Sequence, residues 1–352
     1  MMIIAALALS GCRKNSSSET SETTATEAVT EVTVYETTAT ENTTVAEGIN
    51  PLTGECGYNA DVYGKRPVAV MVNNVKPSLP QYGIKEADII YELPVEAGIT
   101  RLMAIYADYT KVPDVCSVRS CRYYYPLIAL GFDAFYCHWG MDMTVAKETL
   151  ERTGIDRFDG GGPSGSGIFF RDSERQKTYA SEHTGYLDGS ALAKKINAAY
   201  RTDANEKNYG GGLVFGENTT PIGDVCLKLT LNFSSSYYST FQYNEETGKY
   251  LKFHSGSPHI DSRTGNQLDF KNIFILQTSS SLREDGYLVD VELNGGSGYY
   301  VSNGRIVPII WEKPEEDEPI KLFTANLEPL VLNPGKSYFG IIGYDKKINL
   351  TE

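Results

Sequence analysis

The stretch Arg66-Pro67-Val68-Ala69-Val70-Met71-Val72-Asn73-Asn74 decides the fold of the first half of the chain. Its continuous apolar run ends at two asparagines, which is typical of a short buried strand. Residues 87–92 and 100–106 have the same β-branched and aromatic character, and Gly98 separates them. The pattern therefore predicts three strands between residues 67 and 106.

Helical patterns follow these strands. Residues 122–130, 143–152 and 190–200 are predicted to form helices, with Asp142 as the N-cap candidate of the second and with the third starting near Asp188. Residues 132–137 are predicted to form a further strand. Mixed strands and helices at these spacings predict an α/β layered N-terminal domain over residues 50–213.

The pattern changes near residue 223, where alternation typical of strands replaces helical spacing. The predicted strands cover residues 227–231, 240–243, 272–277, 287–293, 298–301, 305–311 and 320–324. Residues 244–248 are predicted to form a hairpin loop. The expected fold class is α+β, with a mixed α/β N-terminal domain followed by a β-rich C-terminal domain over residues 223–349.

The start of the chain carries an export signal. Residues 1–9 form an apolar run, and Leu9-Ser10-Gly11-Cys12 resembles a bacterial lipobox, in which the cysteine is acylated. A bilayer span needs roughly 20 apolar residues, so this run is too short. Residues 1–12 are therefore expected to be a lipoprotein signal peptide, and Cys12 the lipid anchor.

A tether is expected to follow the anchor. Residues 13–49 are rich in Ser, Thr and Glu and poor in large hydrophobic residues, so they cannot bury enough apolar surface to fold. The expected location is the extracytoplasmic face of the bacterial cell membrane, where the lipid on Cys12 holds the chain.

Composition limits the partners. The net charge of −13 argues against nucleic acid and against a basic membrane-binding patch. No cofactor is expected. The abundant tyrosines suit a surface that contacts sugars or peptides. Five cysteines follow Cys12; they are either buried free thiols or include a disulfide between Cys116 and Cys121.

Several segments together resemble one family, the bacterial lipoproteins of the YerB type, which carry a two-part domain of unknown function. In the first half these are residues 66–74, 87–92, 96–101 and 117–122, although the family usually has a small residue in place of Cys121. In the second half they are residues 250–253, 259–261, 264–265, 285–287 and 332–335. The resemblance implies an exported, membrane-anchored chain of two consecutive domains, and it implies no reaction.

Three arginines form the first candidate site. Arg101, Arg119 and Arg122 lie near predicted strand ends, where ligands bind in α/β folds. Two guanidinium groups close to Ser120 suit a bidentate grip on a carboxylate or phosphate. The alternative is a structural salt-bridge network that neutralises Glu92 and Glu96.

Two histidines and a carboxylate are the candidates for acid/base chemistry. His138 follows a predicted strand, with Asp142 close behind, and a histidine exchanges protons near neutral pH. His183 and Glu92 are the other candidates. The alternative for His138 is a structural hydrogen bond to a backbone carbonyl. A catalytic triad through Ser120 is not favoured, because the G-x-S-x-G motif is missing there.

A third cluster lies in the second half. His254, His259 and Asp261 are close enough in sequence to suggest a divalent metal site. The favoured interpretation is a turn in which Asp261 accepts backbone hydrogen bonds, so no metal is expected.

Two functions are consistent with these patterns. The first is a lipoprotein that binds an anionic or glycan-like cell-envelope ligand, a cell-wall glycan, a peptide or an anionic small molecule, in a cleft with Arg101, Arg119, Ser120, Arg122, His138 and Asp142. The alternative is a cell-envelope hydrolase in which His138 or His183 acts with a carboxylate as acid/base.

Overall fold

The apolar stretch that begins at Val68 forms strand β1 (Val68–Asn73) in the computed structural model of the protein, which describes residues 48–351. All six residues of β1 are buried. Val68 and Val70 enter one hydrophobic core, whereas Ala69 and Met71 enter another. Because side chains alternate along a strand, β1 is covered on both faces, and its sequence is therefore continuously apolar.

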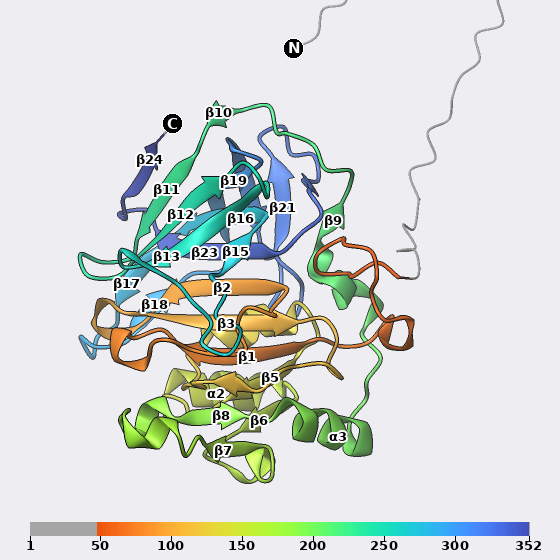
Figure 1. Ribbon diagram of the computed structural model, residues 1–352, viewed down its shortest axis with the longest axis vertical. Coiled ribbons are helices and arrows are strands. Elements are labelled where there is room, and N and C mark those ends of the chain that lie inside the picture. The colour runs from red at the N-terminus through yellow and green to blue at the C-terminus, as the bar shows by residue number, and fades with distance from the viewer. Residues whose placement is uncertain (1–47, 352) are drawn as a thin grey trace, which may run out of the picture. The chain divides into compact units, whose positions relative to one another are not determined.

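β1 lies in an eleven-stranded mixed sheet, the main sheet, in which neighbouring strands are stacked across the molecule (Figure 1). In sheet order the strands are β10 (Asp224–Val225), β20 (Arg305–Glu312), β19 (Gly295–Ser302), β16 (Asn272–Thr278), β23 (Ser337–Gly343), β2 (Ile89–Pro94), β3 (Thr100–Tyr106), β1, β5 (Phe135–His138) and β6 (Arg157–Asp159), and β21 (Lys321–Thr324) also pairs with β20. Five of these strands come from the first half of the chain. The two halves therefore share one sheet.

Strand β23 makes the connection between the halves. It pairs in parallel with β16 of the second half and with β2 of the first half. This strand was not predicted from the sequence. Its segment contains two glycines, and only Lys336 separates it from a turn-forming Asn-Pro-Gly sequence, so the apolar run is short and interrupted.

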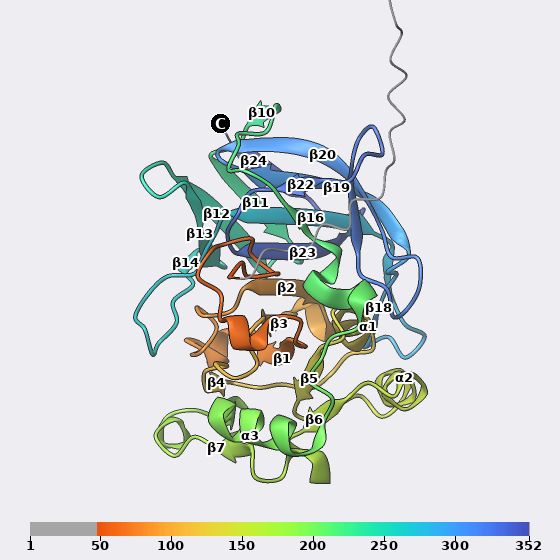
Figure 2. The same ribbon diagram turned by 90° about the vertical axis from the view of Figure 1, so that its right-hand side faces the viewer.

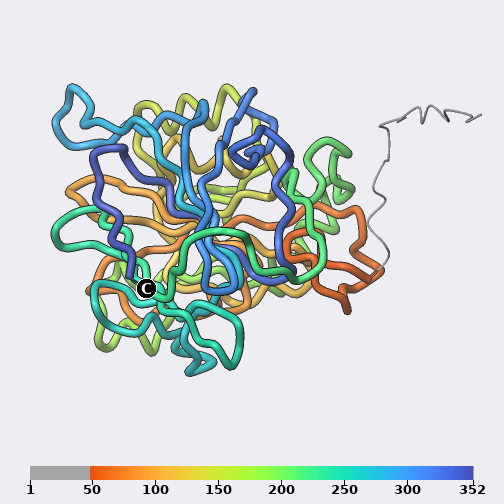
Figure 3. The backbone as a smooth tube through the Cα atoms, turned by 90° about the horizontal axis from the view of Figure 1, so that it is seen from above, coloured from red at the N-terminus to blue at the C-terminus, as the bar shows by residue number. Residues whose placement is uncertain are grey.

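A second sheet packs on the first hydrophobic core of the main sheet. Its strands are β14 (Ser257–Pro258), β13 (Lys249–His254), β12 (Tyr238–Asn244), β11 (Lys228–Asn232) and β24 (Ile348–Thr351), with β15 (Asp269–Phe270) also pairing with β13. Buried and half-buried residues alternate along β13, as expected for a strand with one face on a core. The C-terminal strand β24 lies beside β11 (Figure 3).

Three α-helices are present in residues 48–351, namely α1 (Tyr124–Leu130), α2 (Val145–Thr153) and α3 (Gly189–Ala199). Ile128 and Leu150 place α1 and α2 on the second core, whereas Leu192 places α3 on the first. Helices α2 and α3 lie at the end of the molecule formed by β5 and β6 (Figure 2). Short 3₁₀ helices cover Ala60–Val62, Lys76–Ser78, Glu96–Gly98, Pro163–Gly165, Arg175–Lys177, Ser181–His183 and Glu206–Gly212.

Three small sheets complete the fold. They are formed by β4 (Val115–Cys116), β8 (Gly185–Leu187) and β7 (Phe169–Arg171), by β17 (Ser280–Leu282) and β18 (Val289–Val291), and by β22 (Val331–Leu332) and β9 (Val214–Phe215).

The α+β fold class and the strands predicted from residue 67 to residue 106 are confirmed, as is the helix predicted to start near Asp188. Asp188 is the N-cap of this helix, and its carboxylate accepts a hydrogen bond from the Ala191 amide. Two predicted strands are shorter than expected. The strand predicted at residues 132–137 begins only at Phe135, because Asp133 has a positive φ of 52°. The strand predicted at residues 287–293 is limited to β18.

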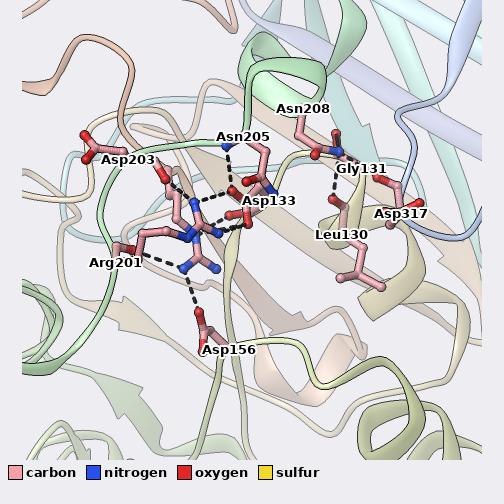
Figure 4. A network of polar contacts seen from close by, with 10 residues as sticks. Leu130, Gly131, Asp133, Asp156, Arg201, Asp203, Asn205, Asn208 and Asp317 are labelled. Carbon is pink, nitrogen blue, oxygen red and sulfur yellow. Dashed lines mark hydrogen bonds and ion pairs between the residues drawn. The ribbon is translucent and has the colours of Figure 1, made fainter.

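The segment between the halves is fixed by a polar network (Figure 4). The Arg201 guanidinium donates to both carboxylate oxygens of Asp133, at 2.8 and 2.9 Å. The Asn208 amide donates to the Asp317 carbonyl of the second half at 2.6 Å and to the Leu130 carbonyl at the end of α1 at 3.3 Å. These bonds orient the chain as it passes from one half to the other.

The predicted lipid anchor at Cys12, and the tether up to residue 47, lie outside the described residues. Between residues 48 and 351, no helix is long and apolar enough to cross a membrane. The five cysteines in this range are free thiols, so Cys116 and Cys121 are not joined.

Candidate functional site

The candidate residues of the first half, except Glu92, gather at one edge of the main sheet. Strand β1 is parallel to β5, β5 to β6, β2 to β23, and β23 to β16, while β1 and β2 are both antiparallel to β3. The carboxyl ends of these six parallel strands therefore point to the same edge, where β3 begins with Thr100 and Arg101. Ligands of open α/β sheets bind at such edges.

Arg101 and Arg122 share one carboxylate at this edge. Glu96 Oε1 lies 2.5 Å from Arg101 Nη2 and 2.7 Å from Arg122 Nη2, and Glu96 Oε2 lies 2.9 Å from Arg122 Nε. Burial acts to raise the pKa of Glu96, but the two guanidinium groups outweigh it and lower that pKa. This is the geometry of the structural network considered in the sequence analysis, with Glu96 as its centre and without Glu92.

Arg119 lies closer to solvent. Its Nη2 is 2.6 Å from Glu182 Oε2, and about a quarter of its side chain (27%) is exposed, compared with 54% for Glu182. His183 Nδ1 is 3.0 Å from the Asn73 amide nitrogen at the end of β1, and its Nε2 is 3.7 Å from Glu182 Oε1. An exposed ion pair of this kind is weak, so a ligand can compete for Arg119.

Two further arginines, which the sequence analysis missed, belong to the same region. Arg171 is exposed and lies over the Trp139 ring, 4.2 Å from its centroid. Partial burial of its guanidinium group is the main cause that lowers the pKa of Arg171, and the positive charge of Arg119 is the second. Arg175 donates to the carbonyls of Ser78, Pro80 and His183. In the sequence these two arginines lie in a run of polar loop residues, a pattern that does not indicate which groups they contact.

We call Arg101, Arg119, Arg122, Arg171 and Arg175 the arginine edge. Among residues 48–351 its five guanidinium groups form ion pairs with only two carboxylates, those of Glu96 and Glu182. Other donors go to backbone carbonyls, including the Ser120 carbonyl, which accepts from Arg101. Three of the five arginines are therefore paired with a carboxylate, whereas Arg171 and Arg175 form no ion pair within the described residues, although the charge of Arg175 acts on Asp172.

His138 is not available to solvent. Its side chain is fully buried, its Nδ1 lies 2.9 Å from the Gly140 carbonyl, and Asp159 is 3.9 Å away. Its Nε2 has no partner in the described part of the chain. Burial lowers the pKa of His138. The hydrogen bond between His138 and the Gly140 carbonyl corresponds to the structural role considered for His138 as the alternative to catalysis.

Asp142 has a local role. Its Oδ1 accepts hydrogen bonds from the Thr144 and Ala146 amides at the start of α2, at 3.3 and 3.2 Å. Asp142 therefore accepts hydrogen bonds at the start of α2, but the N-cap residue is Thr144, so the N-cap predicted at Asp142 is wrong.

Glu92 belongs to a different site, the junction between the main sheet and the second sheet. Its Oε2 accepts from Ser239 Oγ at 2.7 Å and from Tyr338 Oη at 2.8 Å, and lies 3.2 Å from Lys252 Nζ. Its Oε1 accepts from Thr100 at 2.8 Å and from Asn74 at 3.1 Å. Burial acts to raise the pKa of Glu92, but the charge of Lys252, that of His254 and the hydrogen bonds from Ser239 and Thr100 together lower it.

Lys252 extends this network into the second half. Its Nζ lies 2.8 Å from Ser239 Oγ and 3.2 Å from His259 Nδ1, and His259 Nε2 lies 2.9 Å from Gln81 Oε1. We call the following residues the junction cluster: Asn74, Gln81, Glu92, Thr100, Ser239, Lys252, His254, His259 and Tyr338. Each is buried. The sequence analysis named Glu92, His254 and His259 but missed Lys252 and Tyr338.

The turn predicted at Asp261 is confirmed. Its Oδ1 accepts from the Arg263 and Thr264 amides, and its Oδ2 accepts from the Ile84 and Lys85 amides of the first half. In residues 48–351 no group of three His, Cys, Asp or Glu residues is arranged to hold a metal ion.

The shared main sheet defines a class of protein: an α+β chain whose two halves are joined through β23, which lies between β16 of the second half and β2 of the first half. Comparison with known families identifies the family to which this chain belongs. Residues 52–203 match the N-terminal domain, and residues 229–339 the C-terminal domain, of the family described as "Protein of unknown function (DUF3048)". The chain belongs to this family.

One curated relative is "Putative lipoprotein YerB" of Bacillus subtilis (strain 168), which is 27% identical over 297 residues, covering 83% of this chain and 85% of the relative. The crystal structure of the YerB protein from Bacillus subtilis superimposes with a TM-score of 0.72 and covers 86% of this chain and 99% of that chain. The resemblance proposed from the sequence is therefore confirmed.

Proposed function

We propose that this chain is a lipoprotein, held through a lipid on Cys12 at the extracytoplasmic face of the bacterial cell membrane, that binds an anionic cell-envelope ligand at the arginine edge. The lipobox-like residues 9–12 support the anchor, as does the name of the relative, a putative lipoprotein. The proposal includes a flexible tether over residues 13–49, which would extend the reach of the folded part beyond the membrane.

The excess of guanidinium groups over carboxylates at the arginine edge carries the binding proposal. The chain has a net charge of −13, so this local excess of positive charge differs from the average surface. Arg119 and Arg171 are the members with solvent access, and they lie at the strand ends beside Trp139. A phosphate or carboxylate that displaces Glu182 from Arg119 gains charge-assisted hydrogen bonds.

Glycan-like ligands are the favoured subclass. Anionic envelope polymers combine acidic groups with sugar rings, and the exposed Arg171, which lies over the half-buried Trp139 ring, can bind such an acidic group. The sequence grouped His138 and Asp142 with this site. In the proposal they do not contact the ligand but hold the backbone of residues 137–146 through hydrogen bonds to Gly140, Thr144 and Ala146.

The binding test uses the folded protein with pyrophosphate and an anionic cell-wall glycan fragment as probes, measured by calorimetry and thermal shift. We expect Arg119→Gln with Arg171→Gln to weaken binding at least tenfold. Arg152→Gln is the matched control, because Arg152 is an exposed arginine that pairs with Glu316 elsewhere. Equal affinity of the double variant and the control would exclude the arginine edge as the site.

The anchor is tested separately. Cys12→Ser should move the expressed protein from the membrane fraction to the soluble fraction and remove the lipid mass from its N-terminal peptide. An unmodified Cys12 in the membrane-bound wild type would contradict the anchor.

A second candidate function, a cell-envelope hydrolase, is supported by the pairing of His183 with Glu182. His183 Nδ1 is held by Asn73, which leaves Nε2 toward the exposed carboxylate. Release of soluble fragments from purified wall material by the wild type, abolished in His183→Ala, is the expected result. Equal release by both proteins would remove His183 from such a reaction.

A further inference from the structure

His254 is the least satisfied side chain of the junction cluster. Only 3% of the residue is exposed, and neither ring nitrogen has a hydrogen-bond partner within residues 48–351. Its ring contacts those of Tyr237 and His259, with centroid distances of 5.7 and 5.6 Å. A protonated ring would bury two unpaired N–H donors and a charge, which costs more than burying the neutral ring. The closed cluster therefore holds His254 neutral.

The hydrogen bonds around His259 fix its proton as well. The Gln81 amide nitrogen donates to the Asn73 carbonyl at 2.8 Å, so Gln81 Oε1 faces His259 Nε2 and must accept from it. His259 Nδ1 is then the acceptor for the Lys252 ammonium group. A second proton on His259 would occupy Nδ1 and point at that ammonium group. Protonation of His259 is thus incompatible with its contact to Lys252.

The charged groups around the two rings do not offset the positive charge that an added proton would bring. Lys252 on β13 and Lys76 on the 3₁₀ helix Lys76–Ser78 are positive, and Glu92 on β2 is the single carboxylate whose charge acts on His254. Both oxygens of Glu92 are already used by five donors, among them the Tyr338 hydroxyl from β23. Glu92 therefore has no remaining acceptor site for an imidazolium.

We propose that the junction cluster is a proton-sensitive closure: uptake of protons by His254 and His259 releases the Tyr237–His259 segment of the second sheet from the main sheet. The cluster joins β2 and β23 of the main sheet to β12 and β13 of the second sheet. The loop before β12 contains the exposed residues 235 and 236. Phe241 and Tyr250 within the segment are buried in the first hydrophobic core, so its release exposes part of that core.

The direction of the pH effect follows from the burial of the two rings. Burial lowers the pKa of His254 to about 4, with Lys252 contributing, and lowers that of His259 well below its ordinary value. In the open state both histidines regain an ordinary pKa of about 6.5. The closed state is therefore fully favoured above about pH 6.5 and loses stability as the pH falls toward about 4.

Hydrogen–deuterium exchange at pH 7.0 and 4.5, referenced to intrinsic rates, tests this closure. The protection factors of residues 237–259 should fall by at least about 100-fold between the two pH values, whereas those of α3 should change little. A uniform loss over both segments, or no loss in residues 237–259, would overturn the proposal.

Two variants and an NMR titration distinguish whether His254 senses protons or only fills space in the junction cluster. His254→Phe fills the same space without titrating and should reduce the acid-induced loss of protection at least fivefold. His138→Phe, which removes a buried histidine on β5 instead, should leave that loss unchanged. If His254→Phe does not fold, a histidine-selective NMR titration of the wild type decides: titration of His254 near pH 6.5 without loss of protection would refute the proposal.

Discussion

Lys252 Nζ lies 3.2 Å from Glu92 Oε2, and the two side chains expose 0% and 1% of their surface. Both charges have left water, so their mutual attraction and the surrounding hydrogen bonds must offset a large desolvation cost. Lys252 comes from the second sheet and Glu92 from the main sheet, so the pair specifies how the two sheets meet.

Lys252→Met should destabilise the fold by about 3–5 kcal/mol, because it leaves the Glu92 carboxylate buried without its cation. Urea unfolding followed by circular dichroism measures the change. The double variant Lys252→Met with Glu92→Leu should recover part of this loss, since no unpaired charge remains. A double variant less stable than either single variant would contradict this account.

Glu96→Gln should cost about 2–4 kcal/mol at pH 7, because Arg101 and Arg122 lose their shared carboxylate in a buried site. The folded-state pKa of Glu96 is lowered, so its charge contributes stability above about pH 4.5, and this contribution disappears as the pH falls through the folded-state pKa. The difference in unfolding free energy between wild type and variant should therefore narrow from pH 7 to pH 3. A constant difference would show that the charge of Glu96 is not responsible.

Asp261→Ala should destabilise the protein by about 2–4 kcal/mol, because four backbone amides from both halves lose their acceptor. Asp285→Ala is the matched control, since the Asp285 carboxylate also accepts two amide bonds but lies in an exposed turn. The control should lose less than about 1 kcal/mol. Thermal denaturation of both variants gives the comparison.

Gly340→Val should weaken the contact between the two sheets. A Cβ atom at Gly340 on β23 would lie 2.6 Å from Leu231 Cδ1 on β11 and 3.2 Å from the Tyr338 ring. Overpacking of this kind costs about 1–3 kcal/mol. Combining it with Leu231→Ala should restore part of the unfolding free energy, and no recovery would place the strain elsewhere.

Cys56 should be the only one of the five described cysteines that reacts quickly with iodoacetamide in the native protein at pH 8. It is exposed, whereas Cys116, Cys121, Cys137 and Cys226 are buried. Burial raises the pKa of Cys116 to about 11 and that of Cys121 to about 12, so their reactive thiolate forms are scarce. Mass spectrometry of labelled peptides before and after unfolding measures this, and rapid native labelling of Cys121 would contradict the buried site.

The sequence determined those parts of the fold whose signal is local. Strands β1, β2 and β3 were predictable because a strand buried on both faces must be continuously apolar, and α3 because Asp188 caps a helical pattern. The turn at Asp261 was predictable for the same reason, since its first two acceptor bonds lie within three residues.

Only the tertiary structure decided which charges meet. The sequence placed Arg101 and Arg122 near strand ends, but a guanidinium group fits any nearby carboxylate, and the choice of Glu96 over Glu92 depends on how β2 and β3 end. Tyr338 donates to Glu92 across 246 positions of sequence, from a strand that the sequence did not reveal. Local apolar periodicity specifies a strand and its buried faces, whereas its neighbours in the sheet depend on long-range packing, which no short segment encodes.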